Sequence, residues 1–398
     1  MDKVRYGIIG VGNQGSYYAS LFAEGKIADG VLTAVCDVNP VKLDSVRAKL
    51  PAEVTYFTDY TQMLDSGLID AVMVEVPHYF HPEMVMAALS RGLHVISDKP
   101  AGVYTKQVRE MNEFAEKHHA LFGMMFNQRT NHVYRKMREI IAAGGIGKLQ
   151  RVNWIITDWY RTQKYYDSGS WRATWAGEGG GVLINQCPHQ IDLVSWVVGE
   201  MPKTVRGFCQ YGKWHDIEVE DEVTAYFEYE SGATGVFITT TGEAPGTNRF
   251  EVSGTRGKLL CENKKLLYFK NSCDSQENSR TSSEGFKKPQ VEVIEPETDG
   301  LNLQHAGIIN NFTEAILGKE ELFVAGTQGI KGVELMNAIE LSGWRGGEAV
   351  TLPVNEEEYL AELDRHVAVS RLKVGNDNEV AGTLDFGTGL GNIKNPGK

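Results

Sequence analysis

The segment GGGVLINQCPHQIDL (179–193) places Asn185, Cys187, His189 and Asp192 within eight residues. Such a set is compatible with a metal site, a thiol nucleophile or a proton-transfer centre. Cys187 lies two residues from His189, so on a helix the two side chains point to different sides. Proline follows the cysteine. We therefore expect no catalytic thiol, and a histidine whose role is to exchange protons or to bind substrate.

A second candidate group, Lys99, ends the apolar run LHVISDKP (93–100) and precedes a proline. X-Pro bonds are the ones that can be cis, and such a bond would fix the direction of the lysine. A lysine in a partly desolvated crevice can exchange a proton with an alcohol. The elements around it decide whether Lys99 is in such a crevice.

The N-terminus contains a glycine-rich turn between a strand and a helix. The run VRYGIIGVGNQG leads from apolar residues into Gly10, Gly12, Asn13, Gln14 and Gly15, and a helical stretch follows. These glycines permit a tight turn and let the backbone approach a pyrophosphate at the helix N-terminus. A second apolar run, VLTAVCD, ends at Asp37, close to the spacing expected for a carboxylate that binds a ribose hydroxyl. We predict a bound nicotinamide dinucleotide.

Asp37 also bears on which dinucleotide binds. Its carboxylate would repel a 2′-phosphate, and the following residues DVNPVK contain no arginine; Lys42 is the nearby cation. We expect NAD, with NADP the less favoured alternative.

Apolar runs and helical patterns then alternate as far as residue 127. The strand-like runs are 70–77, 93–100 and 120–127, and the helical patterns are 81–92 and 105–119. Strict alternation predicts a doubly wound parallel sheet, an α/β Rossmann domain over 1–127, whose ligands lie beyond the carboxyl ends of the strands. The residues expected at that crevice are Pro77, His78, Asp98, Lys99 and Asn127.

His78 and His81 form an H-x-x-H pair. Two histidines without a third ligand make a poor metal site, so we expect no metal and assign both residues to the nicotinamide or the substrate. The acidic run HDIEVEDE (215–222) is interpreted as a solvated strand edge and loop rather than a metal cluster.

Residues 128–355 show a different pattern, a helix followed by strands in direct succession. This predicts an α+β domain with a large open, mainly antiparallel sheet. We expect one face to cover the crevice and the other to pair with another subunit, giving a homodimer or homotetramer. Residues 271–300 are interpreted as a surface loop. The segment 356–398 begins as a helix and ends as an extended tail.

Aromatic residues are dense between positions 154 and 175, with arginines among them. Exposed aromatic faces stack on the C–H faces of carbohydrates, and polar groups bond the hydroxyls. Some of these residues must belong to the sheet core. From this region we expect Tyr166, Trp171 and Arg172 at a sugar pocket, together with His305 from a late helix.

The overall composition narrows the class of partner. The net charge of −12 argues against nucleic acid and anionic membranes, and no run of 18 apolar residues is present. The five cysteines are scattered, and the N-terminus has no signal-peptide pattern. We expect a cytoplasmic protein with a small-molecule substrate.

Taken together, these motifs resemble the Gfo/Idh/MocA family. The resemblance rests on GIIGVGNQG, VPHYFHPEMVMAALSRGLHVISDKP, FNQR, GGGVLINQCPHQIDLVSWVVG, VSGTRGKL, NNFTEAILG and AIELSGWRGGEAVTLP. It implies a pyridine-nucleotide oxidoreductase acting on sugars, sugar derivatives or cyclitols, with the catalytic lysine at Lys99 and the catalytic histidine at His189. The segment DKP departs mildly from the usual EKP.

Many family members carry an aspartate where this chain has Asn185. An amide cannot act as a base, so the resemblance assigns proton transfer to Lys99 or His189 and substrate orientation to Asn185. If the segment is helical, Asn185 and His189 share one face. The segment NQCPH (185–189) resembles that of family members that look like glycoside dehydrogenases. This resemblance implies oxidation of a ring hydroxyl of a glycoside, the one at C3. The alternatives are an inositol dehydrogenase, a redox-assisted glycosidase or lyase with tightly bound NAD, and a nucleotide-sensing protein without catalysis.

Overall fold

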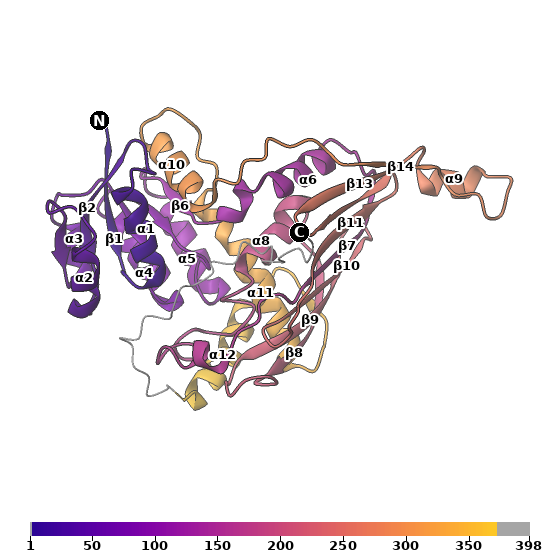
Figure 1. Ribbon diagram of the computed structural model, residues 1–398. Helices are drawn as coiled ribbons and strands as arrows, with labels where there is room; N and C mark the ends of the chain where they lie inside the picture. Colours follow the sequence, from indigo (N-terminus) through magenta and orange to yellow (C-terminus); the bar gives the residue numbers. More distant parts are fainter. Residues whose placement is uncertain (1, 372–398) are drawn as a thin grey trace, which may run out of the picture.

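The computed structural model describes residues 2–371 and contains two sheets (Figure 1). The first sheet is parallel and six-stranded, in the order β3-β2-β1-β4-β5-β6. Its strands are β1 (Val4–Ile9), β2 (Gly30–Cys36), β3 (Thr55–Phe57), β4 (Ala71–Val74), β5 (His94–Ser97) and β6 (Phe122–Met124). The predicted Rossmann fold is confirmed.

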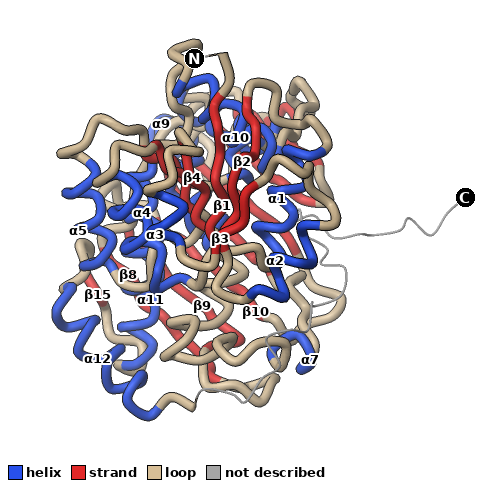
Figure 2. Tube along the Cα trace, turned by 90° about the vertical axis from the view of Figure 1, so that its left-hand side faces the viewer, coloured by secondary structure: helices blue, strands red, loops and turns tan. Residues whose placement is uncertain are grey.

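Helices cover both faces of this sheet. They are α1 (Asn13–Ala23), α2 (Pro40–Arg47), α3 (Tyr60–Leu64), α4 (His81–Leu89) and α5 (Thr105–Ala115), with a short 3-10 turn η1 (His78–Phe80) before α4. Figure 2 shows α1 and α2 on one side of the sheet and α4 and α5 on the other. Strand β4 is buried along its whole length, as expected for a strand covered on both faces.

The second sheet has nine strands in the order β14-β13-β12-β11-β7-β10-β9-β8-β15. All neighbours pair antiparallel except β7 and β10, so the predicted open, mainly antiparallel sheet is also confirmed. The strands are β7 (Leu149–Ile156), β8 (Thr204–Tyr211), β9 (Glu220–Glu228), β10 (Thr234–Thr240), β11 (Asn248–Gly254), β12 (Gly257–Glu262), β13 (Lys265–Asn271), β14 (Val291–Ile294) and β15 (Val350–Thr351).

Three helices lie between the two sheets: α6 (His132–Ala142), α8 (Pro188–Val198) and α11 (Gly329–Trp344) (Figure 1). The remaining elements are α7 (Gln163–Tyr166), α9 (Ser275–Thr281), α10 (Gln304–Ile316), α12 (Glu356–Val369) and the 3-10 turns η2 (Asn127–Thr130) and η3 (Gly326–Gln328). Strands β7 and β9 alternate buried and exposed residues, because one face of the sheet packs on these helices and the other does not.

Two late helices return to the first sheet. In α10, Thr313 bonds the hydroxyl of Tyr6 on β1 at 2.7 Å, and in α12, Glu356 pairs with Arg109 of α5 at 3.0 Å. The domain boundaries at residues 127 and 355 therefore stay predictions, since α10 bonds a strand of the first sheet and α12 packs against α5, a helix that covers this sheet. The helix predicted after residue 355 is present, and the predicted tail from residue 372 lies outside the described residues.

Two expectations for the second half are wrong. The expected surface loop at 271–300 contains α9 and β14, and α9 lies on an arm that projects from the end of the sheet (Figure 1). In the acidic run, Glu220 and Asp221 are fully buried rather than solvated. Asp221 accepts hydrogen bonds from the backbone N–H groups of Lys213 and Trp214, which satisfy its buried carboxylate.

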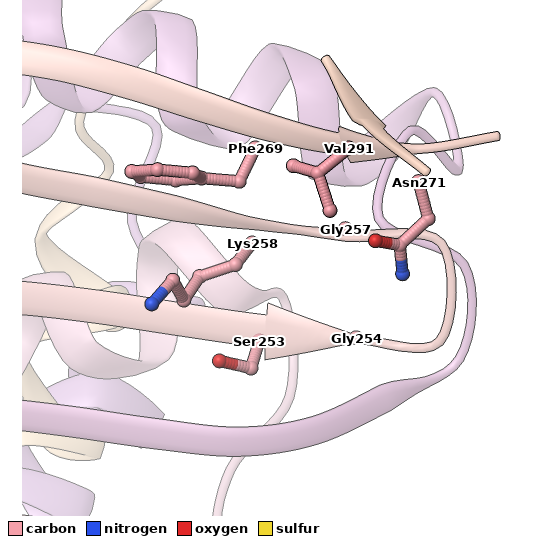
Figure 3. Close-up of a pocket in the computed structure, with 7 residues that line it drawn as sticks. All are labelled: Ser253, Gly254, Gly257, Lys258, Phe269, Asn271 and Val291. Carbon is pink, nitrogen blue, oxygen red and sulfur yellow. The ribbon is translucent and has the colours of Figure 1, made fainter. Parts of the chain in front are cut away.

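The open face of the large sheet carries a shallow hollow of about 280 Å³ near the arm (Figure 3). It is lined by Ser253, Gly254, Gly257, Lys258, Phe269, Asn271 and Val291. None of the predicted site residues lines it, so the chemistry must be sought elsewhere. Over residues 2–371, no helix is long and apolar enough to span a bilayer.

Candidate active site

The glycine turn after β1 has the form that a dinucleotide phosphate requires. Gly10 has a φ of +88°, and a Cβ there would meet the carbonyl oxygen of Glu75 at 2.2 Å. A Cβ on Gly15 would meet the carbonyl oxygen of Gly10 at 1.9 Å, whereas Gly12 has nothing within 4 Å of its Cβ position. Close packing therefore requires glycine at positions 10 and 15. Gly12 leaves open space at the N-terminus of α1, the helix that begins with Asn13 and Gln14.

Asp37, directly after β2, is held beside this turn. Its side chain is buried, with Oδ2 accepting from the N–H of Val11 and Oδ1 from the N–H of Asn39, both at 2.9 Å. Each carboxylate oxygen keeps further acceptor capacity for a ribose hydroxyl. The residues therefore fit the adenosine half of a dinucleotide.

His78 and His81 follow Pro77 at the end of β4, and their contacts differ. The Nδ1 atom of His78 lies 3.1 Å from the carbonyl oxygen of Glu178, and its ring meets Trp171 edge to face. His81 begins α4, and its two ring nitrogens each lie 2.7 Å from a carbonyl oxygen, of Val76 and of Pro100. His81 thus ties two strand-end loops together, which leaves neither nitrogen for a ligand. Burial lowers the pKa of both histidines.

Lys99 lies at the end of β5, and its bond to Pro100 is cis. Its backbone N–H donates to Asp98 Oδ1 at 2.8 Å. Its Nζ atom donates to the main-chain oxygen of Asn185 at 3.0 Å, which links the end of β5 to the turn before α8. Lys99, Asn185 and His189 are each only partly buried.

His189 lies in the first turn of α8. Its ring is 6.5 Å from Phe126, measured between centroids, and its Nδ1 atom is buried with no hydrogen-bond partner among the described residues. Burial, followed by the charges of Lys99 and His305, holds the pKa of His189 well below its usual value. The imidazole is therefore neutral at physiological pH and able to accept a proton.

Asn185 is not on the same helix as His189. Helix α8 begins at Pro188, and Asn185 belongs to the turn before it, where its N–H donates to the carbonyl oxygen of Gly181 at 3.0 Å. The expectation of one shared helix face is wrong, because proline sets the first helical position three residues later. Both residues nevertheless lie at the crevice.

The side chain of Asn185 contacts Glu178, which sequence reasoning missed. Asn185 Nδ2 donates to Glu178 Oε1 and lies 3.4 Å from the hydroxyl oxygen of Tyr165. Glu178 is 1% exposed, and burial raises its pKa above the usual range. A carboxylate in GEGGG carries no periodic signal, so only its position seven residues before Asn185 could have drawn attention to it.

Of the two adjacent tyrosines, Tyr165 rather than Tyr166 lies beside Asn185. Tyr166 is 2% exposed, and its hydroxyl donates to Thr241 at 2.7 Å. The hydroxyl oxygen of Tyr165 accepts from Arg172 at 2.7 Å and from Gln186 at 3.2 Å. The segment after β7 is irregular apart from α7, so the sequence offers no period that tells which tyrosine is buried.

His305 in α10 and Asn127 in η2 complete the predicted set. The His305 ring lies 5.4 Å from that of Tyr18, and burial lowers the pKa of His305 to about 4. Asn127 is buried and donates at 2.6 Å to Oε1 of Gln304, the residue that directly precedes His305.

Glu75, between β4 and Pro77, is a second buried carboxyl group that sequence reasoning missed. Burial, followed by the charge of Asp98, raises the pKa of Glu75 well above its usual value. Glu75 and Asp98 are therefore two neighbouring carboxyl groups at the ends of adjacent strands.

The glycine turn and Asp37 together fit a dinucleotide at the carboxyl ends of the strands of the first sheet. Comparison with known proteins agrees with this geometry. Residues 4–126 match the family model described as "Oxidoreductase family, NAD-binding Rossmann fold", and residues 134–260 match "GFO/IDH/MocA C-terminal domain". Together the two models cover more than half of the chain.

Individual relatives are distant. The chain is 26% identical over 267 residues to myo-inositol 2-dehydrogenase of Thermotoga maritima, covering 65% of this chain and 75% of the relative. It is 24% identical over 293 residues to levoglucosan dehydrogenase of Pseudarthrobacter phenanthrenivorans, covering 65% and 74%. A crystal structure of the WlbA dehydrogenase of Bordetella pertussis has a TM-score of 0.73 at 23% identity and covers 89% of this chain and 100% of that one. The last likeness shows the fold.

Proposed function

Because the chain belongs to the Gfo/Idh/MocA family of oxidoreductases, we propose that it is an NAD-dependent dehydrogenase of a ring hydroxyl in a sugar or glycoside. The observation that carries the proposal is the 3.0 Å contact between Lys99 Nζ and the main-chain oxygen of Asn185. It sets a proton-transfer group of the nucleotide-binding sheet beside an amide from the other half of the chain.

The cofactor end of the proposal rests on the glycine turn and on Asp37. The open space at Gly12 and the N-terminus of α1 would hold the pyrophosphate, and Asp37 would accept from the adenosine ribose. The same carboxylate disfavours the 2′-phosphate of NADP. When bound, the nicotinamide accepts the hydride that leaves the substrate carbon. Asp98, Asn127 and His78 would line its end of the crevice.

Oxidation of an alcohol also releases a proton, which the chain must accept. Lys99 Nζ and the neutral imidazole of His189 are the two groups at the crevice that can take it from the hydroxyl oxygen. Asn185 remains a hydrogen-bonding group, since an amide does not titrate. Its carbonyl oxygen would accept from a hydroxyl next to the one oxidised.

The proposed substrate is a glycoside oxidised at C3. Support comes from the NQCPH segment, from Trp171 and Arg172 at the crevice, and from a levoglucosan dehydrogenase among the relatives. A cyclitol is the second candidate, because the Thermotoga relative bears the name myo-inositol 2-dehydrogenase. Both have neighbouring ring hydroxyls, which the same groups would bind.

A substrate screen tests the proposal. The protein is incubated with NAD, and in parallel with NADP, on methyl glucosides, levoglucosan, myo-inositol and free aldoses, and reduced nicotinamide is followed by absorbance. We expect turnover with NAD on at least one glycoside and a ketone at C3 by product NMR. Turnover of inositol alone would favour the cyclitol alternative, and cleavage of a glycosidic bond without net reduction would favour a redox-assisted glycosidase.

The open face of the large sheet is the proposed subunit interface. Ile155 and Ile238 on neighbouring strands point to this face and are only partly buried within one chain. A second copy that covers the face would bury them and give the homodimer or homotetramer that the sequence predicts.

A further inference from the structure

Glu178 is a buried carboxylate that the predicted proton transfer does not use. It is 1% exposed and lies in the loop between α7 and α8, on neither a helix nor a strand. Its Oε2 atom accepts from the backbone N–H of Ala173 at 2.5 Å, and its own N–H donates to Thr174 at 2.9 Å. The carboxylate is therefore fixed in direction by the main chain that surrounds it.

The other carboxylate oxygen faces the crevice residues. Glu178 Oε1 accepts from Asn185 Nδ2, and the guanidinium of Arg172 lies 3.7 Å from the same oxygen. Arg172 makes its shorter contact, at 2.7 Å, with the hydroxyl of Tyr165. Glu178 is thus bonded directly to the amide, whereas its ion pair with Arg172 is long.

Oε2 of Glu178 already accepts from Ala173, and Oε1 accepts from Asn185, so the acceptor that faces the amide selects its nitrogen. Tyr165 also lies on the nitrogen side, 3.4 Å from Nδ2. Within residues 2–371, both hydrogen-bond partners of the Asn185 side chain bond its nitrogen. The amide oxygen, Oδ1, is then left as an acceptor on a residue whose main-chain oxygen binds Lys99 Nζ.

We propose that Glu178 is a positioning residue that turns the Asn185 amide so that Oδ1 accepts from the substrate hydroxyl adjacent to the one being oxidised. The inference rests on the proposed function, because it assigns a specificity to the same crevice. It defines the substrate class as polyols with two neighbouring free hydroxyls, one facing Lys99 and one facing Asn185.

The proposal predicts discrimination between a polyol and its deoxy analogues. Methyl β-D-glucopyranoside is compared with its 2-deoxy and 4-deoxy analogues in the wild type, Glu178→Gln and Asn185→Leu. In the wild type, removal of one of the two hydroxyls should lower kcat/KM about 10- to 100-fold, since it leaves Oδ1 unpaired. A glutamine at 178 can donate as well as accept, so the amide is no longer held in one orientation. In both variants the discrimination should shrink to about threefold or less, and the loss on the full substrate should lie mainly in KM.

A matched control separates positioning from folding. Glu218 supports the same loop from outside the crevice, accepting from the N–H of Trp175 at 2.7 Å, so Glu218→Gln should keep the wild-type discrimination. The affinity for NADH, measured by fluorescence, should be unchanged in all variants. If Glu178→Gln does not fold, Glu178→Asp replaces it and should show an intermediate discrimination.

The proposal would be overturned if Glu178→Gln lowers kcat/KM by the same factor on methyl β-D-glucopyranoside and on its deoxy analogues. The variant would then discriminate between these substrates as the wild type does. If the wild type oxidises none of the panel, the proposed function fails separately. In that case, the change in melting temperature that each sugar causes is measured on the NADH-loaded protein. Equal changes in the wild type and in Glu178→Gln would overturn the role of Glu178. A response to the full sugar that only the wild type shows would support that role.

Discussion

Lys99 Nζ donates to the main-chain oxygen of Asn185 at 3.0 Å, although the two residues are 86 positions apart in the chain. The lysine is held from the Rossmann side by the end of β5, and the acceptor is held by the turn that precedes α8. In the proposed function, this contact marks where a substrate hydroxyl would lose its proton. Because it uses a main-chain oxygen, the Asp-to-Asn difference from many family members leaves it intact.

Replacement of Lys99 tests its proposed role in proton transfer. In Lys99→Met, we expect kcat on the best substrate to fall about 10²- to 10⁴-fold, the usual contribution of a general acid or base. The affinity for NADH should change little, since the phosphate and ribose contacts remain. Steady-state kinetics and NADH fluorescence give the two numbers. Activity within twofold of wild type would remove Lys99 from the chemistry.

Asp37 should decide the choice of dinucleotide. Asp37→Ser removes the acceptor for the ribose hydroxyls and the charge that repels a 2′-phosphate, so the preference for NAD over NADP should fall by about one to two powers of ten. Binding isotherms for NADH and NADPH measure the ratio, with Asp44→Ser on the exposed face of α2 as control. An unchanged ratio would mean that other residues make the selection.

The buried ion pair between Asp192 of α8 and Arg129 of η2 should be sensitive to loss of one partner. Arg129 and Asp192 are 3% and 4% exposed and lie 2.6 Å apart. Asp192→Asn leaves the guanidinium without its charge partner and should lower the free energy of unfolding by about 3–5 kcal/mol. Urea unfolding measures this. The double variant Arg129→Met/Asp192→Leu should be more stable than Asp192→Asn, because it leaves no unpaired buried charge. A double variant that is less stable than Asp192→Asn would show that the unpaired charge is not the cause of the loss.

Two buried carboxyl groups beside Gly180 and Gly181, those of Glu340 and Glu220, give stability a pH dependence. Burial raises the pKa of Glu220 to about 7, and burial together with Glu220 raises that of Glu340 well above its usual value. A Cβ on Gly180 would meet Glu340 Oε1 at 2.8 Å, so the pair packs directly under GGG. In the unfolded chain a glutamate has a pKa of about 4.5, so both groups have a higher pKa in the folded protein. Their contribution to stability is therefore complete below about pH 4.5 and is lost as the pH rises through the folded pKa.

In Glu340→Gln, only the carboxyl group of Glu220 can still ionise. We expect the fall in melting temperature between pH 5 and pH 8 to be smaller by several degrees than in wild type. The exposed Glu320→Gln should behave as wild type. A fall of the same size in Glu340→Gln would show that other groups cause it.

The open sheet face should determine the oligomeric state. Ile238→Glu places a charge at its centre and should shift a dimer or tetramer to a smaller species, measured by light scattering after gel filtration. An unchanged mass for Ile238→Glu, or a wild type that is already monomeric, would place the interface elsewhere or remove it.

The parts of the site on regular elements could be predicted from the sequence. Lys99 and Asp37 follow strands of an alternating pattern, and in the glycine turn close packing explains Gly10 and Gly15. Glu178 and Tyr165 could not be predicted, because they lie between β7 and α8 in a segment that is irregular apart from the single turn of α7. The burial of Asp221 could not be predicted either, because its charge indicates solvent, whereas its partners are main-chain N–H groups of the loop that precedes β9.

The most direct test of the account is to locate the hydride and the ketone in one reaction. The protein is incubated with NAD and methyl β-D-glucopyranoside deuterated at C3, and the products are examined by NMR. The account predicts deuterium at C4 of the nicotinamide, a ketone at C3 of the sugar, and the loss of both signals in Lys99→Met. Deuterium retained on the sugar while the nicotinamide is reduced would contradict C3 as the reacting carbon. Full transfer in Lys99→Met would contradict the crevice between Lys99 and Asn185 as the catalytic site.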